Sequence, residues 1–127
     1  RERRDVRVVA DQIGAPTSAA CIAQGVAHAI ARRPDAIGTW HFAAGGHASW
    51  RDFAEAIFSE ALARGLLAQV PTLEGITSAQ YPARARRPAY SLLDTQRFER
   101  DFGLHIGDWR EGLAAVMDAL AAQGHAP

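Results

Sequence analysis

The stretch GTWHFAAGGHASWRDFAEAIF, residues 38–58, joins two periodicities that together indicate an α/β unit. GTWHFA, residues 38–43, alternates and is β-prone, which predicts a strand, and AGGH at 44–47 predicts the turn after it. Ser49 is a favourable N-cap for the helix that follows, and Gly65 is its expected end. Apolar side chains recur at helical spacing in this helix and are expected to face the core: Trp50, Phe53, Ala54, Ile57, Phe58 and Leu62.

A similar order of elements precedes this stretch. VRVVA, residues 6–10, is rich in β-branched residues and predicts a strand, and DQIGAPT, residues 11–17, predicts a turn. Thr17 or Ser18 can then cap a helix that runs to about Arg33, where RRPD ends it. Three apolar residues share one face of this helix: Ile22, Val26 and Ile30.

The remainder of the chain predicts little sheet and two further helices. AQVPTLEGIT, residues 68–77, has room for one or two short strands, and YPARARRPAYS, residues 81–91, is typical of an extended loop. A short helix is expected from its cap Asp94 to Gly103, and a last amphipathic helix begins at its cap Asp108. The inward-facing residues expected in the last helix are Trp109, Leu113, Val116, Met117 and Leu120.

These elements predict an α/β fold with few strands and about four helices. No repeat or low-complexity linker divides the 127 residues, so we expect a single domain or fragment over 1–127. The order is βα, βα, a further short strand, a loop and two helices. A free-standing doubly wound sheet would need more strands than this.

Composition excludes several classes of protein. The formal net charge is zero, which argues against a general nucleic-acid binder. No apolar run is long enough to cross a membrane, and the first residues, RERRDVRV, lack the apolar segment of a signal peptide. Cys21 is the only cysteine, so no internal disulfide forms, which suits a reducing cytosol. We therefore expect a cytoplasmic protein.

All fourteen basic residues are arginines, and the chain has no lysine. No Schiff-base lysine, P-loop lysine or Tyr-x-x-x-Lys pair therefore exists within it. The chain begins at Arg1 and its one methionine is Met117, so we expect a piece of a longer protein.

The candidate catalytic and metal motifs are weak. His41 and His47 flank a glycine turn at a spacing that no familiar metal site uses, so no metal site is assigned, and His41 is expected to be hydrogen-bonded beside the core. HFAAGGHASW, residues 41–50, lacks the Gly-x-Gly-x-x-Gly pattern, which favours a tight turn over a phosphate-binding loop. Cys21 has no evident base, and a Gly-x-Ser-x-Gly elbow is absent from the sequence.

The most informative polar cluster is the arginine block at Arg84, Arg86 and Arg87. In an extended loop these guanidinium groups can grip a diphosphate bidentately. The alternative is a solvated loop in which one arginine pairs with a carboxylate such as Asp94 or Glu99. The residues alone leave both interpretations open.

Four motifs in this order resemble the C-terminal part of the dTDP-4-dehydrorhamnose reductase family, which belongs to the extended short-chain dehydrogenase/reductases with a Rossmann-type fold. They are VVADQIGAPTSA, GTWHFAAGGHASWRDFAEAIF, YPARARRPAYSLLD and FGLHIGDWREGLAAVM. The resemblance implies a substrate-binding part without the N-terminal dinucleotide-binding half. It also implies that the complete enzyme reduces dTDP-4-dehydro-L-rhamnose to dTDP-L-rhamnose with NADPH or NADH.

The same resemblance implies the site residues. Gln12 and Thr17 match the polar positions of the family's DQ-x-G-x-PT stretch and are expected to face the nucleotide sugar. Arg87 matches RP-x-x-S-x-LD, together with Asp94, and is expected on the substrate side. No catalytic, cofactor or metal residue is assigned to this chain, which is expected to be inactive alone and to bind no cofactor by itself.

Two alternatives remain. One is a non-catalytic module of the same fold that binds a nucleotide sugar or another protein. The other is the substrate domain of a different nucleotide-sugar epimerase or reductase. A fragment of this kind is expected to expose apolar surface that the missing Rossmann half would cover, and to self-associate or to exchange domains through an opened N-terminal strand.

Overall fold

The computed structural model describes residues 5–82 and 85–124 of the chain. These residues form four α-helices and a few short strands, so the predicted α/β fold with few strands and about four helices is confirmed. The elements in chain order are β1 (Asp5–Val9), β2 (Ile13–Gly14), α1 (Ala19–Arg32), β3 (Ala48–Ser49), α2 (Trp50–Ala63), β4 (Thr72–Ile76), the 3₁₀ turn η1 (Ser78–Gln80), α3 (Gln96–Phe102) and α4 (Trp109–Ala122).

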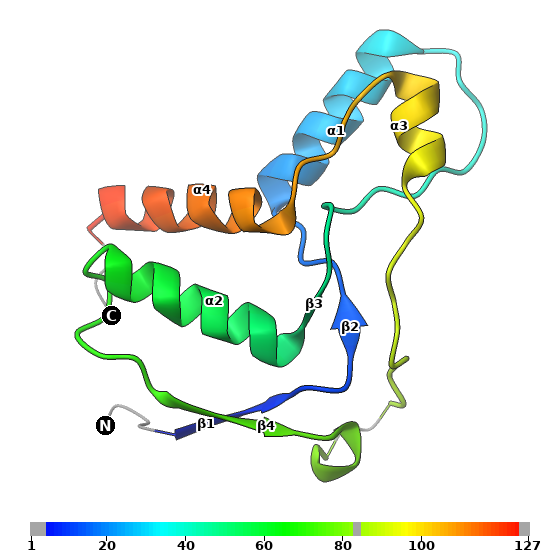
Figure 1. The fold of residues 1–127 in the computed structure, drawn as a ribbon. Coiled ribbons are helices and arrows are strands. Elements are labelled where there is room, and N and C mark those ends of the chain that lie inside the picture. Colours follow the sequence, from blue (N-terminus) through cyan, green and yellow to red (C-terminus); the bar gives the residue numbers. More distant parts are fainter. Residues whose placement is uncertain (1–4, 83–84, 125–127) are drawn as a thin grey trace.

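One end of the molecule is layered, as Figure 1 shows, with α4 on one side of α2 and the β1–β4 ribbon on the other. β1 and β4 pair in parallel, with Val9 opposite Ile76. Parallel neighbours require a long crossover connection, and here the crossover contains α1 and α2. β2 pairs antiparallel with β3 through only two residues, Ile13 opposite Ser49 and Gly14 opposite Ala48.

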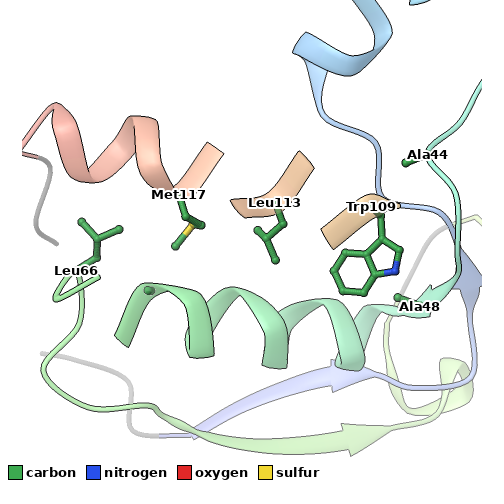
Figure 2. Packing of buried hydrophobic residues seen from close by; sticks show 7 residues of the cluster. Ala44, Ala48, Leu66, Trp109, Leu113 and Met117 are labelled. Carbon is green, nitrogen blue, oxygen red and sulfur yellow. The ribbon is translucent and has the colours of Figure 1, made fainter. Parts of the chain in front are cut away.

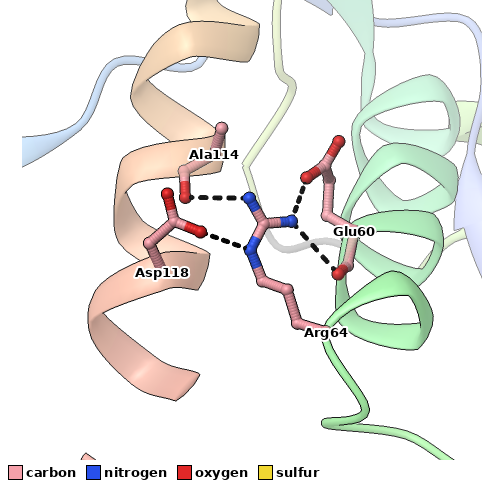
Figure 3. Close-up of polar contacts among 4 residues, drawn as sticks. All are labelled: Glu60, Arg64, Ala114 and Asp118. Carbon is pink, nitrogen blue, oxygen red and sulfur yellow. Dashed lines mark hydrogen bonds and ion pairs between the residues drawn. The ribbon is translucent and has the colours of Figure 1, made fainter. Parts of the chain in front are cut away.

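The main core lies between α2 and α4 (Figure 2). Trp109, Leu113 and Met117 of α4 are buried against α2, and Phe53 meets the Trp109 indole edge to face with 5.7 Å between ring centroids. Arg64 joins the same two helices at their far ends (Figure 3). Its Nε donates to Asp118 at 2.7 Å, and its Nη1 donates to the Glu60 carboxylate.

A second, smaller core joins α1 to α3 and to the segment between α1 and β3. Phe98 and Phe102 of α3 are buried, and the Trp40 and Phe42 rings pack on them with centroids 5.1 and 4.9 Å apart for the pairs Trp40–Phe102 and Phe42–Phe98. The indole Nε1 of Trp40 donates to Asp101 Oδ2 at 2.9 Å. This cluster is aromatic and small, whereas the main core is larger and mostly aliphatic.

The predicted strand at 38–43 is wrong. The alternation is present, because Trp40 and Phe42 are half-buried while Thr39 and His41 are exposed. The segment is not a strand, because among the described residues it pairs with no other strand and its aromatic side chains pack on α1, on α3 and on the chain that follows α3. His41 is exposed rather than beside the core.

Three of the predicted helix caps are confirmed, and the fourth, Asp94, lies one residue before the N-cap of α3, which is Thr95. Ser18, rather than Thr17, caps α1 by accepting from the Cys21 N–H, and Asp108 caps α4 by accepting from the Arg110 N–H. Ser49 caps α2 as one half of a capping box with Asp52. In α3 the Asp94 carboxylate accepts from the Gln96 N–H although the helix begins two residues after it. Gly65 and Gly103 follow their helices with positive φ, as expected of C-terminal stops.

The apolar residues expected to face inward on α2 and α4 are buried or half-buried along the middle of each helix face, and several at the sides of that face are exposed. Phe53 and Ile57 pack on the main core, but Trp50 and Leu62 are exposed. In α4, Val116 and Leu120 are likewise exposed while the other three expected residues are buried. The 3.6-residue period fixes the direction of a helix face but not its width, and the partner of each helix covers only a narrow stripe.

No helix within the described ranges, 5–82 and 85–124, is both long and apolar enough to span a bilayer.

Candidate functional site

An open cavity of about 1180 Å³ lies beside the C-terminal ends of β1 and β4. Its walls come from β1 and the chain that follows it, from the N-terminus of α2, from η1 and from the loop before Ser91. We call this cavity the groove. Its lining residues fall in the segments 7–16, 48–53, 78–81 and 85–91.

The loop of residues 85–91, which carries Arg86 and Arg87, forms one wall of the groove because it is hydrogen-bonded to β2. Ile13 N–H donates to the Ala89 carbonyl at 2.8 Å, and Ser91 N–H donates to the Ile13 carbonyl at 2.9 Å. The Ser91 hydroxyl adds a third bond to the Ile13 carbonyl at 3.1 Å. Pro88 keeps the residue before it out of the helical region, so this part of the loop stays extended and can pair. This pairing of the loop with β2 places Arg86 and Arg87 in the lining of the groove.

The charges around the groove are mainly positive. Its described lining contains Arg7, Arg86 and Arg87 and a single carboxylate, that of Asp11. Arg7 is already paired with Glu74, with 3.3 Å between Nε and Oε2. Neither Arg86 nor Arg87 forms an ion pair or a hydrogen bond with another residue in the described part of the chain, and both are exposed. Two guanidinium groups are therefore open to an anionic ligand.

The carboxylates considered as partners of the arginine block are engaged elsewhere. Asp94 accepts from the Gln96 N–H at 2.9 Å. Glu99 accepts from the Ile106 N–H at 2.8 Å and lies 3.2 Å from Nδ1 of His105. Arg84, the first arginine of the block, lies outside the described residues.

Gln12 lines the groove at the end of β1 and is half-buried. Its Nε2 donates to the Ser78 hydroxyl at 2.9 Å. Ser78 in turn donates from Oγ to Asp11 Oδ1 at 2.7 Å and from its backbone N–H to the same carboxylate. These bonds lower the pKa of Asp11, the hydroxyl bond being the larger cause and the backbone bond the second.

Thr17 is placed differently from Gln12 and Arg87. Its hydroxyl donates to the Ala15 carbonyl at 3.0 Å and accepts from the Ala44 N–H at 3.0 Å. Thr17 is not part of the groove lining, although its neighbours Ala15 and Pro16 are. The structure thus brings Gln12 and Arg87 to one cavity, while Thr17 joins the groove wall to the turn before β3.

Aromatic side chains also reach the groove. Trp50, expected in the core, lines the groove instead and is 57% exposed, because it is the first residue of α2 and lies beyond the stripe that α4 covers. Phe53 and Tyr81 line the groove too. An aromatic face beside two arginines suits a ligand that combines an apolar or aromatic ring with phosphate.

Sequence reasoning missed Ser78 and Trp50 as groove residues. A signal for Ser78 did exist, because Asp11 and Ser78 each lie two residues beyond the ends of two strands, Val9 and Ile76, that face each other in the ladder. Carboxyl ends of parallel neighbours meet at one edge of a sheet, so polar residues just after them come together. That signal becomes usable only once β1 and β4 are known to be neighbours.

Among the described residues, no group of three or more His, Cys, Asp or Glu side chains is arranged to hold a metal ion. Cys21 and His28 line a second cavity of about 240 Å³ beside Phe42 and His105. His28 is engaged there, with Nε2 at 2.9 Å from the Phe102 carbonyl.

Known proteins resemble the chain in both sequence and fold. The dTDP-4-dehydrorhamnose reductase of Shigella flexneri is 37% identical over 123 residues, which cover 94% of this chain and 41% of the relative. The enzyme of the same name from Aggregatibacter actinomycetemcomitans is 42% identical over 120 residues, covering 91% and 41%. This chain therefore spans about two fifths of the length of these curated relatives.

The solved structure of dTDP-4-dehydrorhamnose reductase from Bacillus anthracis, in complex with NADP, superposes with a TM-score of 0.80 at 30% identity. The match covers 91% of this chain and 38% of that one, so the α/β fold seen here corresponds to part of a reductase structure. The family model described as RmlD substrate binding domain matches residues 1–122. A match over nearly the whole chain shows that it belongs to the RmlD substrate binding domain family.

Proposed function

We propose that the groove binds a dTDP-linked deoxyhexose and that the chain is the substrate-binding part of a dTDP-4-dehydrorhamnose reductase. The observation that carries this proposal is the convergence of Gln12 and Arg87 on one cavity. The two residues are 75 positions apart in sequence, and the pairing of Ile13 with the loop around Tyr90 brings them together.

The groove offers a chemically distinct surface for each part of such a ligand. Arg86 and Arg87 suit the diphosphate, because guanidinium groups bind phosphate oxygens bidentately. Trp50 and Tyr81 offer flat apolar faces for the pyrimidine ring or the deoxyhexose. Gln12 supplies a polar contact, and Thr17 acts on the ligand only through the shape of the groove wall.

In the complete enzyme the proposed reaction reduces the C4 ketone of dTDP-4-dehydro-L-rhamnose to the alcohol of dTDP-L-rhamnose. NADPH or NADH supplies the hydride when it is bound. The residues of this chain do not fit that cofactor, because the sequence has neither the glycine fingerprint of a dinucleotide site nor any lysine. We therefore assign to this chain the binding and orientation of the nucleotide sugar, and we assign no chemical step to its residues.

The test is the affinity of the chain for dTDP, measured by calorimetric titration, for the wild type, Arg87→Ala and Arg32→Ala. Arg32 is an exposed arginine at the end of α1, away from the groove, and serves as the matched control. A hydrogen bond to a charged group contributes about 1.5–3 kcal/mol, so Arg87→Ala should weaken binding by roughly tenfold or more. Arg32→Ala should bind dTDP as the wild type does.

Thermal stability separates this proposal from a purely structural role for Arg87. Since Arg87 is exposed, its removal should change the free energy of unfolding by less than about 0.5 kcal/mol. Failure of the wild type to bind dTDP at millimolar concentration contradicts the proposed function. Equal affinities of the two variants contradict the role of Arg87.

A second function, that of a protein-interaction module, is favoured by one specific observation. The apolar residues Ile22, Val26 and Ile30 of α1 are exposed by 45%, 53% and 63%. A stripe of this kind suits contact with the remainder of a longer reductase or with a second copy of the chain. The two functions are compatible, because α1 does not line the groove.

A further inference from the structure

At the edge of the groove, hydrogen bonds link Gln12, Ser78 and Asp11 in series. The chemical nature of the three side chains decides which atom donates and which accepts in each bond. The series runs from Gln12 Nε2 to Ser78 Oγ at 2.9 Å, and from Ser78 Oγ to Asp11 Oδ1 at 2.7 Å. The Ser78 backbone N–H adds bonds of 2.9 Å to both oxygens of the Asp11 carboxylate. The three residues follow β1 and β4, so the sheet ladder holds them in register.

The ionised carboxylate of Asp11 can only accept hydrogen bonds. The serine hydroxyl has a single proton, and this proton is committed to Asp11 at 2.7 Å. What remains on Ser78 Oγ is acceptor capacity, so its other partner must be a donor. The Gln12 amide therefore presents Nε2 to Ser78, since the opposite orientation would set two oxygens against each other with no proton between them.

This orientation leaves the other end of the amide for the ligand. Gln12 Oε1 has no hydrogen-bond partner among residues 5–82 and 85–124, while Gln12 is half-buried and lines the groove. Because Gln12 lines an open groove, Oε1 is available to accept a hydrogen bond from a donor on a ligand.

We propose that Ser78, held by Asp11, is a positioning residue that fixes the Gln12 amide so that Oε1 faces the groove as a hydrogen-bond acceptor. The groove thereby selects a ligand with a proton donor at that point, either a hydroxyl or an imide N–H. This inference rests on the proposed function and deepens it, because it states what the ligand must supply to Gln12. Neither Ser78 nor Asp11 needs to touch the ligand.

The experiment compares three substitutions in the full 127-residue chain. Ser78→Ala removes the anchor, and Ser59→Ala is the matched control on the exposed side of α2. Asp11→Asn is expected to reverse the direction of the hydrogen bonds that link Asp11, Ser78 and Gln12. The Asn Oδ1 still accepts from the Ser78 N–H, while its Nδ2 donates to the Ser78 hydroxyl. The hydroxyl proton then turns to Gln12, and the amide rotates to present Nε2 to the groove.

The probes are dTDP and dTDP-glucose, and the readouts are affinity and the NMR signals of the Gln12 side chain. In the wild type, ligand should move the ¹³Cδ signal, which reports a bond accepted by Oε1, more than the ¹⁵Nε2 signal. Ser78→Ala should weaken binding by roughly fivefold to tenfold, because a neutral hydrogen bond contributes about 1 kcal/mol. Asp11→Asn should weaken binding and move the larger response to ¹⁵Nε2. A response to dTDP-glucose alone assigns the donor to the sugar, and a response to both probes assigns it to the nucleotide.

Each adverse result has one meaning. If Ser78→Ala binds like Ser59→Ala, or if ¹⁵Nε2 responds in the wild type, the positioning role is wrong while the proposed function stands. If the wild type binds neither probe, the proposed function fails and this inference fails with it. Should Ser78→Ala not fold, the reversal in Asp11→Asn and the wild-type signals still decide the question.

Discussion

The two helix pairs of this molecule are built from similar amphipathic patterns and end in different environments. In the pair α2 and α4, large side chains such as Phe53, Trp109 and Leu113 pack together, and Trp109 and Leu113 are buried. In the pair α1 and α3, the inward side of α1 is formed by small or polar residues, among them Gly25 and Ala29, while its large apolar residues face outward.

The physical reason is the partner that each helix meets. Gly25 is buried under the Phe42 ring, where a Cβ atom would collide with the ring carbons, so α1 approaches the aromatic cluster through a residue without a side chain. The stripe of Ile22, Val26 and Ile30 is therefore left without a partner among the described residues. The comparison shows that helical periodicity identifies an apolar stripe but does not tell whether another element of the structure covers it.

The largest effect is expected at the centre of the α2–α4 pair. Trp109 is 2% exposed and packs against Phe53, so Trp109→Ala should lower the free energy of unfolding by about 3–5 kcal/mol, measured by urea denaturation. Ile30→Ala, on the exposed stripe of α1, should change it by less than about 0.5 kcal/mol. Comparable losses for both variants would show that α1 is as enclosed as α4.

Trp109→Phe sharpens the same prediction. The Trp109 indole Nε1–H has no hydrogen-bond partner within the described part of the chain, so phenylalanine removes an unpaired buried donor and retains an aromatic contact with Phe53. Its loss of stability should be clearly smaller than that of Trp109→Ala. A Trp109→Phe variant as unstable as Trp109→Ala would mean that the indole N–H is essential.

The helix caps give the next largest difference between the two pairs. Ser49 of α2 is 4% exposed, and its hydroxyl and N–H both engage Asp52 in a capping box, whereas Ser18 of α1 accepts one bond of 3.2 Å from the Cys21 N–H. Loss of a serine cap costs about 0.5–2 kcal/mol, so Ser49→Ala should fall near the upper end of this range and Ser18→Ala near the lower end.

Acid unfolding should report the same cap. Hydrogen bonds from the Ser49 hydroxyl and N–H lower the pKa of Asp52 below its ordinary 3.8. The stabilisation from this carboxylate is therefore complete above that value and disappears as the pH falls through the lower pKa of the folded state. Between pH 5 and pH 2, roughly, the wild type should lose more stability than Ser49→Ala does. Parallel pH profiles for the two proteins would contradict the cap as the cause.

Local chemistry explains which parts of the fold the sequence predicted. The caps Ser49 and Asp108 and the stops Gly65 and Gly103 depend on contacts within a few residues, and all four were predicted. The strand expected at 38–43 was wrong, because a strand depends on a distant neighbour as well as on its own alternation.

In the candidate site, too, the residues found from sequence motifs were predicted, and those that depend on long-range pairing were not. Gln12 and Arg87 were singled out from motifs, and the structure places both on the groove. The bonds of Ser78 to Asp11 span 67 residues and depend on the pairing of β1 with β4, which no local pattern specifies. Trp50 was misplaced because its helical spacing matches the core stripe, although its side chain lies outside the narrow part of α2 that α4 covers and lines the groove instead.

The smallest effect on stability, and the most direct test of the comparison, belongs to the stripe on α1. Val26→Gln should leave the free energy of unfolding within about 0.5 kcal/mol of the wild type, because Val26 is 53% exposed. The stripe is nevertheless the surface on which we expect self-association, since burying one valine side chain contributes about 1.5 kcal/mol or more. Sedimentation over a wide concentration range should thus show association of the wild type and a dimer roughly tenfold weaker for Val26→Gln.

The matched control is Val116→Gln, which changes another exposed valine, on α4, that lies away from the stripe. If Val116→Gln weakens association as much as Val26→Gln does, general surface hydrophobicity is the cause and the stripe has no special role. If the wild type stays monomeric throughout, self-association through the stripe is wrong. The two variants together therefore test whether the exposed stripe of α1 is an interface between copies of this chain, which would explain why its large apolar residues lie on the surface while those of α4 pack on α2.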